Sequence, residues 1–97
     1  MIPLPAVEVR KDGKIKADIL NRLVRRGCWG GRYLPAETLV NWISRRVRKD
    51  GHRVRRIIGE LHKAGLLLKH KGGRTISLNA RRVKEIMEYI DRNIENG

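Results

Sequence analysis

Hydrophobic residues recur along this chain with two different spacings. Intervals of three and four residues predict helices over residues 14–26, 35–48, 52–64 and 79–93. Short apolar runs predict strands over residues 32–34, 66–70 and 74–78. Between the last two runs, Lys71-Gly72-Gly73 supplies the positive φ angles that a tight hairpin requires. The pattern therefore predicts one mainly α domain that carries a small β-hairpin, an α+β class.

The helix over residues 52–64 has two clearly different faces. At 3.6 residues per turn, one face gathers apolar side chains, which we expect to point into the core: Val54, Ile57, Ile58 and Leu61. The opposite face gathers His52, Arg56, Gly59 and Lys63, with Arg53 and Arg55 beside it. Gly59 is unusual there, because glycine inside a helix costs about 1 kcal/mol relative to alanine. Close approach of a DNA backbone would explain it, and so would a crossing helix from a partner.

The two ends of the chain are predicted to differ from the middle. Two prolines and the alternating Val7-Glu8-Val9 predict an extended arm over residues 1–13, which closes with a turn at Asp12-Gly13. At the other end, Asn79 can cap the last helix, in the segment 79–97. Its apolar stripe predicts either packing on the domain or a homodimer interface, which we favour, through Val83, Ile86, Met87, Ile90 and Ile94.

Charge is concentrated in the middle of the chain. The protein carries a formal net charge of +13 and has a pI near 11.1, which indicates a polyanionic partner. Residues 45–74 hold eleven Lys and Arg against two acids, whereas residues 81–97 are neutral. A basic helix followed by a basic hairpin is what binding of double-stranded nucleic acid requires.

The order of the predicted elements resembles the winged helix-turn-helix family, small prokaryotic or archaeal transcription regulators among its members. Two consecutive stretches carry the resemblance: Glu60 to Leu67 (ELHKAGLL) and Leu68 to Leu78 (LKHKGGRTISL). Many winged-helix regulators end their recognition helix with a similar L-x-x-x-G-L phrase before the wing. The resemblance implies the order α-β-α-α-β-β-α, with residues 14–78 as the winged domain, and a DNA-binding function.

Within that hypothesis, the helix over residues 52–64 enters the major groove and the wing over residues 69–74 contacts adjacent phosphates. Arg56 and His52 would lie near base edges, where an arginine can discriminate guanine. The full set of predicted nucleic-acid-binding residues is Arg45, Arg46, Arg48, Lys49, His52, Arg53, Arg55, Arg56, Gly59, Lys63, Lys69, Lys71 and Arg74. Trp29 and Tyr33 could stack on exposed bases, but we favour anchors in the core or in the loop.

The sequence argues against several other classes of protein. Cys28 and three histidines lack zinc-ligand spacing, and neither a Walker loop nor a dinucleotide fingerprint occurs, so we expect no metal, no cofactor and no enzyme. No apolar run approaches the ~18–20 residues of a membrane span, and no signal peptide is recognisable. A single cysteine suits a reducing interior. We therefore expect a cytoplasmic, nucleoid-associated protein.

The leading hypothesis is a homodimeric transcriptional regulator that binds double-stranded DNA. A protein that binds structured RNA in a ribonucleoprotein is a second hypothesis, and a chromosome-coating protein with little sequence preference is a third. A protein-interaction winged helix within a larger complex is a fourth, because such folds serve many functions.

Overall fold

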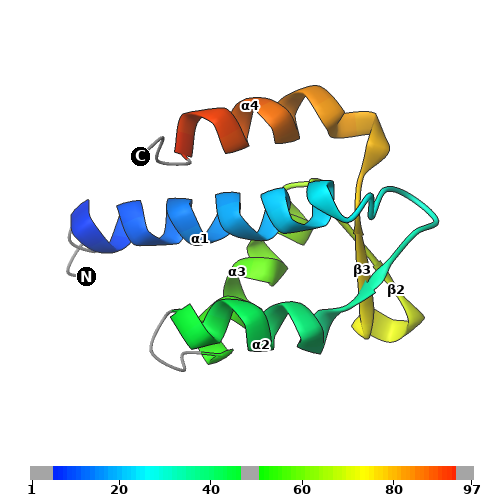
Figure 1. Cartoon of the computed structure of the whole chain (residues 1–97), viewed down its shortest axis with the longest axis horizontal. Helices are drawn as coiled ribbons and strands as arrows, with labels where there is room; N and C mark the ends of the chain where they lie inside the picture. Colours follow the sequence, from blue (N-terminus) through cyan, green and yellow to red (C-terminus); the bar gives the residue numbers. More distant parts are fainter. Residues whose placement is uncertain (1–5, 47–50, 94–97) are drawn as a thin grey trace.

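The computed structural model describes residues 6–46 and 51–93, with side chains described from residue 12 to 44 and from 51 to 93. The elements are α1 (Ala6–Arg25), β1 (Leu34–Pro35), α2 (Ala36–Arg46), α3 (Gly51–Lys63), β2 (Leu67–His70), the 3-10 helix η1 (Lys71–Gly73), β3 (Thr75–Leu78), the 3-10 helix η2 (Ala80–Arg82) and α4 (Val83–Asn93). The chain is mainly helical with a small three-stranded antiparallel sheet, which confirms the predicted α+β class. The order adds η1 and η2 to the predicted elements. Figure 1 shows α1 between α4 and α2, with β2 and β3 at one end of the molecule.

The prediction of an extended arm is wrong from Ala6 onward, since α1 begins there and continues through Asp12 and Gly13. Asp12 accepts hydrogen bonds from arginines of α3, so it serves a tertiary contact instead of a turn. Gly13 permits close approach of α4, because a Cβ at this position would lie 3.1 Å from the side-chain oxygen of Asn93. Two residue types that usually mark a turn are here required by packing between helices.

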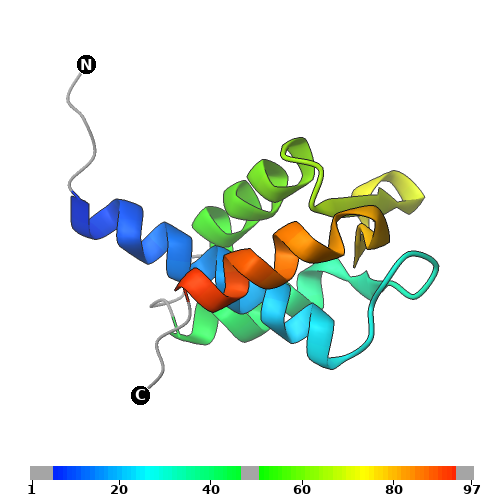
Figure 2. The ribbon, with the colours of Figure 1, turned by 90° about the horizontal axis from the view of Figure 1, so that it is seen from above.

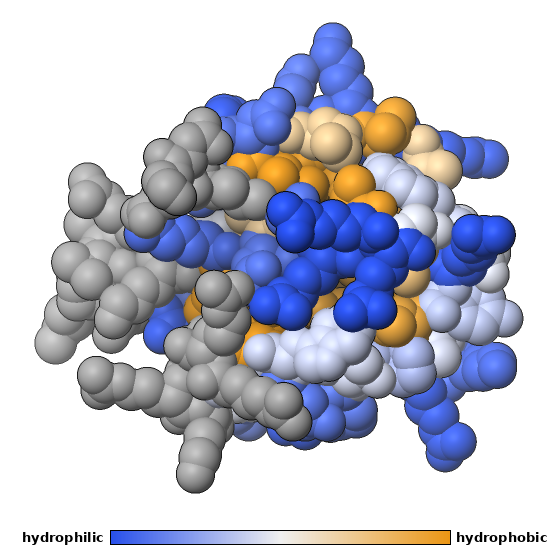
Figure 3. Space-filling view, viewed as in Figure 1, coloured by the Kyte–Doolittle hydropathy of each residue, from blue (hydrophilic) through white to orange (hydrophobic). Residues whose placement is uncertain are grey.

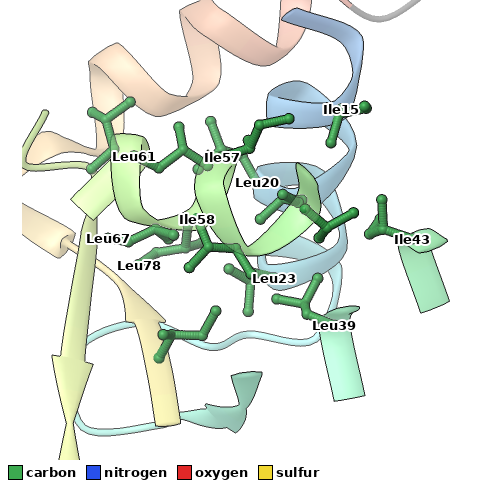
Figure 4. Packing of buried hydrophobic residues seen from close by; sticks show 14 of the residues in the cluster. Ile15, Leu20, Leu23, Leu39, Ile43, Ile57, Ile58, Leu61, Leu67 and Leu78 are labelled. Atoms are coloured by element: carbon green, nitrogen blue, oxygen red, sulfur yellow. The ribbon is translucent and has the colours of Figure 1, made fainter. Parts of the chain in front are cut away.

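The core lies where α1, α2 and α3 meet the sheet (Figure 4). All four α3 residues predicted to face inward are buried, with Ile58 the most exposed at 5%. They pack with leucines and isoleucines of the other elements: Leu20, Leu23, Leu39, Ile43, Leu67, Ile76 and Leu78. Each such side chain contributes about 1.5–3 kcal/mol when it leaves water. This burial fixes which face of α3 remains outside.

The sheet has the strand order β1-β3-β2, with both pairs antiparallel. The core side of β3 carries Ile76 and Leu78, so Thr75 and Ser77 face the other way by the two-residue period of a strand. At the hairpin tip Lys71, Gly72 and Gly73 have φ of 51°, 66° and 90°. The positive φ angles predicted for these three residues are confirmed.

Helix α4 lies along α1, as the two ribbon views together show (Figure 2). Ile86 and Ile90 are 0% and 5% exposed because they face α1 within the same chain. The prediction that these two residues form a dimer interface is therefore wrong. Val83 and Met87 are 48% and 39% exposed, and Ile94 lies outside the described residues.

Within residues 6–46 and 51–93, no helix is long and apolar enough to cross a bilayer. Figure 3 shows hydrophilic side chains along the middle of one face and around its rim, with hydrophobic atoms in narrow strips between them.

Candidate nucleic-acid interface

The arginines of α3 that lie toward α1 are held by a single carboxylate. Arg53 Nε donates to Asp12 Oδ1 at 2.8 Å, and Arg56 Nη2 donates to Asp12 Oδ2 at 3.1 Å. The Asp12 side chain is only 14% exposed. Burial acts to raise the pKa of Asp12, but the hydrogen bonds and charges of Arg53 and Arg56 outweigh it and hold this pKa below its ordinary value of 3.8. Asp12 is therefore a charged bridge between α1 and α3.

A second carboxylate neutralises the same side of α3. Arg56 Nη1 donates to Glu60 Oε1 at 2.9 Å, one helical turn away, and Lys16 Nζ lies 3.4 Å from Glu60 Oε2. The three cations Arg53, Arg56 and Lys16 thus face the two anions Asp12 and Glu60, and this side of α3 keeps a charge of only +1. Arg56 stays 47% exposed, but it is not a free cation.

The side of α3 toward α2 also carries an ion pair. Arg55 donates through Nε and Nη2 to the two oxygens of Glu37, at 3.2 and 3.0 Å. The hydrogen bond from Arg55, together with its charge, lowers the pKa of Glu37 below its ordinary value of 4.5, although loss of water acts to raise it. Both side chains are more than half exposed, so the pair is open to water and to competing anions.

Between these paired arginines lies the outer face of α3, which we define as His52, Gly59 and Lys63. His52 and Lys63 are exposed, and neither forms an ion pair with a residue in the described ranges. A Cβ at Gly59 would meet nothing within 4 Å. Gly59 is thus not required by packing inside this chain, and the surface above it is open.

The hairpin holds the other predicted contact residues. Lys69, Lys71 and Arg74 are exposed, and no carboxylate in the described part of the chain pairs with them. The reason is partly local, because the sequence contains no Asp or Glu over residues 26–36 or 61–84. These two segments form the sheet end of the molecule (Figure 1). Within the described residues, the exposed cations that form no ion pair are therefore more numerous on the hairpin than on α3.

Four of the predicted contact residues cannot be placed by their side chains. Arg45 and Arg46 belong to the last turn of α2, but their side chains lie outside the described part. Arg48 and Lys49 lie wholly outside the described residues.

Tyr33 is a surface residue whose ring packs on another ring. It is 43% exposed, so it is not an anchor in the core, but its contact with His70 agrees with the alternative of an anchor in the loop. Its ring centroid lies 4.6 Å from that of His70, and Lys71 Nζ lies 5.6 Å above it. Trp29, by contrast, packs against the core and forms a bridge with Leu78, in agreement with the prediction. The apolar residues Leu34 and Pro35 that follow Tyr33 in the sequence did not indicate that its side chain is exposed.

A second aromatic–cation contact, at Trp42, was also not predicted from the sequence. Trp42 of α2 lies under the guanidinium groups of Arg26 and Arg22, at 4.1 and 6.0 Å from the ring centre. These residues were not among the predicted contacts. Their cations are placed by the crossing of α1 and α2, which spacing along the chain does not reveal.

A hydroxyl–imidazole pair joins Ser77 of β3 to His70 of β2. Ser77 Oγ donates its single proton to the carbonyl oxygen of Gly30 at 2.8 Å, so the 3.0 Å contact with His70 requires Nε2 of the imidazole to be the donor. Ser77 is fully buried and accepts from the imidazole, which is the reverse of the serine–histidine hydrogen bond that activates a nucleophile. The pair fixes the loop at Gly30 onto the sheet. Over the described residues, no group of three or more His, Cys, Asp or Glu could hold a metal ion.

No protein-family model, curated protein or solved structure matches this chain. The functional interpretation therefore depends on the geometry and charge of its own residues.

Proposed function

We propose that this chain is a winged helix-turn-helix protein that binds double-stranded DNA and acts as a homodimeric transcriptional regulator on the nucleoid. The order of three helices, a hairpin, and a short strand that completes an antiparallel sheet supports the winged arrangement. In this proposal α3 enters the major groove and the hairpin, as the wing, contacts phosphates beside it.

The observation that carries the proposal is the position of four exposed cations that form no ion pair with any residue in the described ranges. They are Lys63 on the outer face of α3 and Lys69, Lys71 and Arg74 on the hairpin, where the sequence has no Asp or Glu from residue 61 to 84. Such cations repel one another until a polyanion neutralises them, and the phosphate backbone of a duplex is the polyanion that spans a helix and a neighbouring hairpin. Counterion release would supply most of the affinity.

The paired arginines of α3 have a more restricted role in this proposal. Arg56 can reach a base edge only after it leaves Asp12 and Glu60. Asp12 would still be neutralised after this change, because Arg53 keeps its own hydrogen bond to Oδ1. The pair with Glu60 is half exposed and contributes little, about 0–1 kcal/mol. Arg56 can thus bind guanine at the modest free-energy cost of breaking its hydrogen bonds to Asp12 and Glu60. His52 and Lys63 have no ion pair to break within the described residues.

Fluorescence anisotropy tests the proposal. The ligands are a random-sequence DNA duplex, an RNA duplex of equal length and an acidic polypeptide, each titrated across salt concentrations. We expect salt-dependent binding of duplex DNA, with each phosphate contact adding about −0.9 to the slope of log K against log salt. Preference for the RNA duplex would instead favour the ribonucleoprotein function, and preference for the polypeptide would favour a protein-interaction module.

A further inference from the structure

The face of the sheet opposite the core presents an aromatic pair. In the antiparallel register His70 lies opposite Thr75, and Thr75 faces away from the core, so His70 shares that outer face. Tyr33 precedes β1 and its ring lies over the same face, 4.6 Å from the ring of His70 and tilted by 31°. This is an offset arrangement of the kind that aromatic pairs prefer.

The backbone holds Tyr33 in place from both sides. The amide of Gly30 donates to the carbonyl of Leu78 at 3.0 Å, and the amide of Leu78 donates to the carbonyl of Cys28 at 2.7 Å. After Tyr33, the strand β1 pairs with β3, and the amide of Ala36 donates to the carbonyl of Arg74. Tyr33 is therefore an exposed aromatic side chain on a fixed loop. Packing in the core does not account for it.

The surroundings of Tyr33 are cationic. Lys71 Nζ lies 5.6 Å from the ring, and Arg32 is exposed next to it in sequence. Arg74 is exposed at the far end of β1, where its carbonyl accepts from the amide of Ala36. No Asp or Glu occurs in either segment that builds this end of the molecule, residues 26–36 and 61–84. Among the described residues the other exposed large apolar side chains, Val83 and Met87, belong to α4. Tyr33 is therefore the exposed large apolar side chain at the sheet end of the described chain, and its neighbours are cations.

An exposed aromatic ring beside cations is the combination that binds unpaired nucleotides. The ring stacks on the base, which every base permits, and the cations neutralise the phosphates on either side. A base inside a duplex is stacked on its neighbours and cannot offer its face to the protein. The ligand that fits Tyr33 is thus a nucleotide outside the double helix.

We propose that Tyr33, backed by His70, stacks on an unpaired base of DNA that flanks the duplex, while Lys71 neutralises a phosphate beside that base. This inference rests on the proposed function, because the flank extends from the duplex bound by α3 and the hairpin. The preferred ligand is a duplex with a single-stranded extension. The weak cation–π contact of Lys71 with Tyr33 in the free protein gives way to the base, and the released ammonium group turns to phosphate.

The test compares a blunt DNA duplex with the same duplex carrying a four-nucleotide single-stranded extension, whose first base is 2-aminopurine. The full-length protein should bind the extended duplex about fivefold or more tightly than the blunt one, the lower end of the range for one stacked base. Stacking on Tyr33 should also change the 2-aminopurine fluorescence. Tyr33→Ala should lose both effects and keep the affinity for the blunt duplex, whereas Tyr33→Phe should keep both.

Controls separate stacking from other causes. Arg92→Ala changes an exposed side chain of α4, away from the sheet, and should leave the preference for the extended duplex intact. Circular dichroism of each variant checks its fold. Equal affinity of the wild-type protein for both duplexes would overturn the inference, as would an unchanged preference in Tyr33→Ala. If Tyr33→Phe fails like Tyr33→Ala, the hydroxyl contacts a phosphate and the stacking proposal is wrong.

The blunt duplex reports on the proposed function separately. Absence of blunt-duplex binding refutes the proposed function, whatever the extension does. Binding of the blunt duplex without a gain from the extension refutes only the inference about Tyr33.

Discussion

Replacing Gly59 with alanine should affect the stability of the free protein and its affinity for duplex DNA in opposite directions. In the free chain a Cβ at this position meets nothing within 4 Å, and Gly59 lies inside the regular helix α3. Alanine is favoured over glycine within a helix by about 0.5–1 kcal/mol. Gly59→Ala should therefore raise the free energy of unfolding by about that amount. For a domain of this size, each kcal/mol corresponds to about 4–8 °C in the melting temperature.

The same substitution should weaken binding of duplex DNA. If α3 lies in the major groove with its outer face inward, the DNA covers the open space above Gly59. A methyl group forced into a closely packed contact typically costs about 1–3 kcal/mol, which corresponds to about five- to 150-fold in affinity. Thermal unfolding followed by circular dichroism measures the first effect, and fluorescence anisotropy with a blunt duplex measures the second.

Gly31 provides the matched control. It lies in the exposed loop before β1, its Cβ would also meet nothing within 4 Å, and its φ is not positive. Gly31→Ala should be neutral or slightly stabilising by restricting the unfolded chain, and it should leave affinity for the blunt duplex unchanged. A Gly59→Ala protein that is more stable and binds duplex DNA as tightly as the wild type would refute our placement of α3.

Three further changes test other parts of the structure. Asp12→Asn removes a charge-assisted bridge, so the free energy of unfolding should fall by about 1.5–3 kcal/mol in chemical denaturation at pH 7. Because folding depresses the pKa of Asp12, its contribution is present above pH 3.8 and disappears as the pH falls through the lower folded value, and the variant should lose that part of the acid dependence. Lys71→Ala should lower the affinity for every duplex sequence alike and reduce the steepness of the plot of log K against log salt by about 0.9. Arg92→Ala on α4 should do neither. A loss of affinity for only some sequences would contradict a contact of Lys71 with phosphate. Ile86→Ala should lower the free energy of unfolding in urea titrations by about 2–5 kcal/mol, because Ile86 packs on α1 within the chain; a loss below about 0.5 kcal/mol would contradict this packing. Met87→Ala should cost less than about 0.5 kcal/mol at protein concentrations where the chain is monomeric, and a larger loss at higher concentration would support the proposed homodimer.

Local periodicity predicted most of the fold. The spacing of Val54, Ile57, Ile58 and Leu61 determined both the existence of α3 and its buried face, because a helix in a small domain has to bury its apolar stripe. The hairpin followed from the glycines at its tip, where few other residues adopt the backbone conformation.

The first turns of α1 were missed for the opposite reason. Asp12 and Gly13 favour a turn locally, but Asp12 is bonded to residues 41 and 44 positions away and Gly13 contacts α4. Contacts at such separations leave no periodic pattern in the sequence. Tertiary packing here outweighs local preference.

The candidate interface was predicted in composition but not in detail. The sequence predicted basic residues on the surface of a helix and of a hairpin, and the i,i+4 spacing of Arg56 and Glu60 is visible in it. It could not show that Arg53 pairs with Asp12 of α1 or that Arg55 pairs with Glu37 of α2, because those two pairs depend on how the helices cross. The exposure of Tyr33 likewise depends on how its loop packs on the sheet, which spacing along the chain does not reveal.

Binding of a random-sequence DNA duplex across salt concentrations, followed by fluorescence anisotropy beside an RNA duplex and polyglutamate, tests the central proposal most directly. The account predicts that the DNA duplex binds best and that log K falls linearly with log salt, with a slope of about −5 to −7 if six to eight phosphates are neutralised. Failure of the DNA duplex to bind at low salt, or tighter binding of polyglutamate, would contradict it.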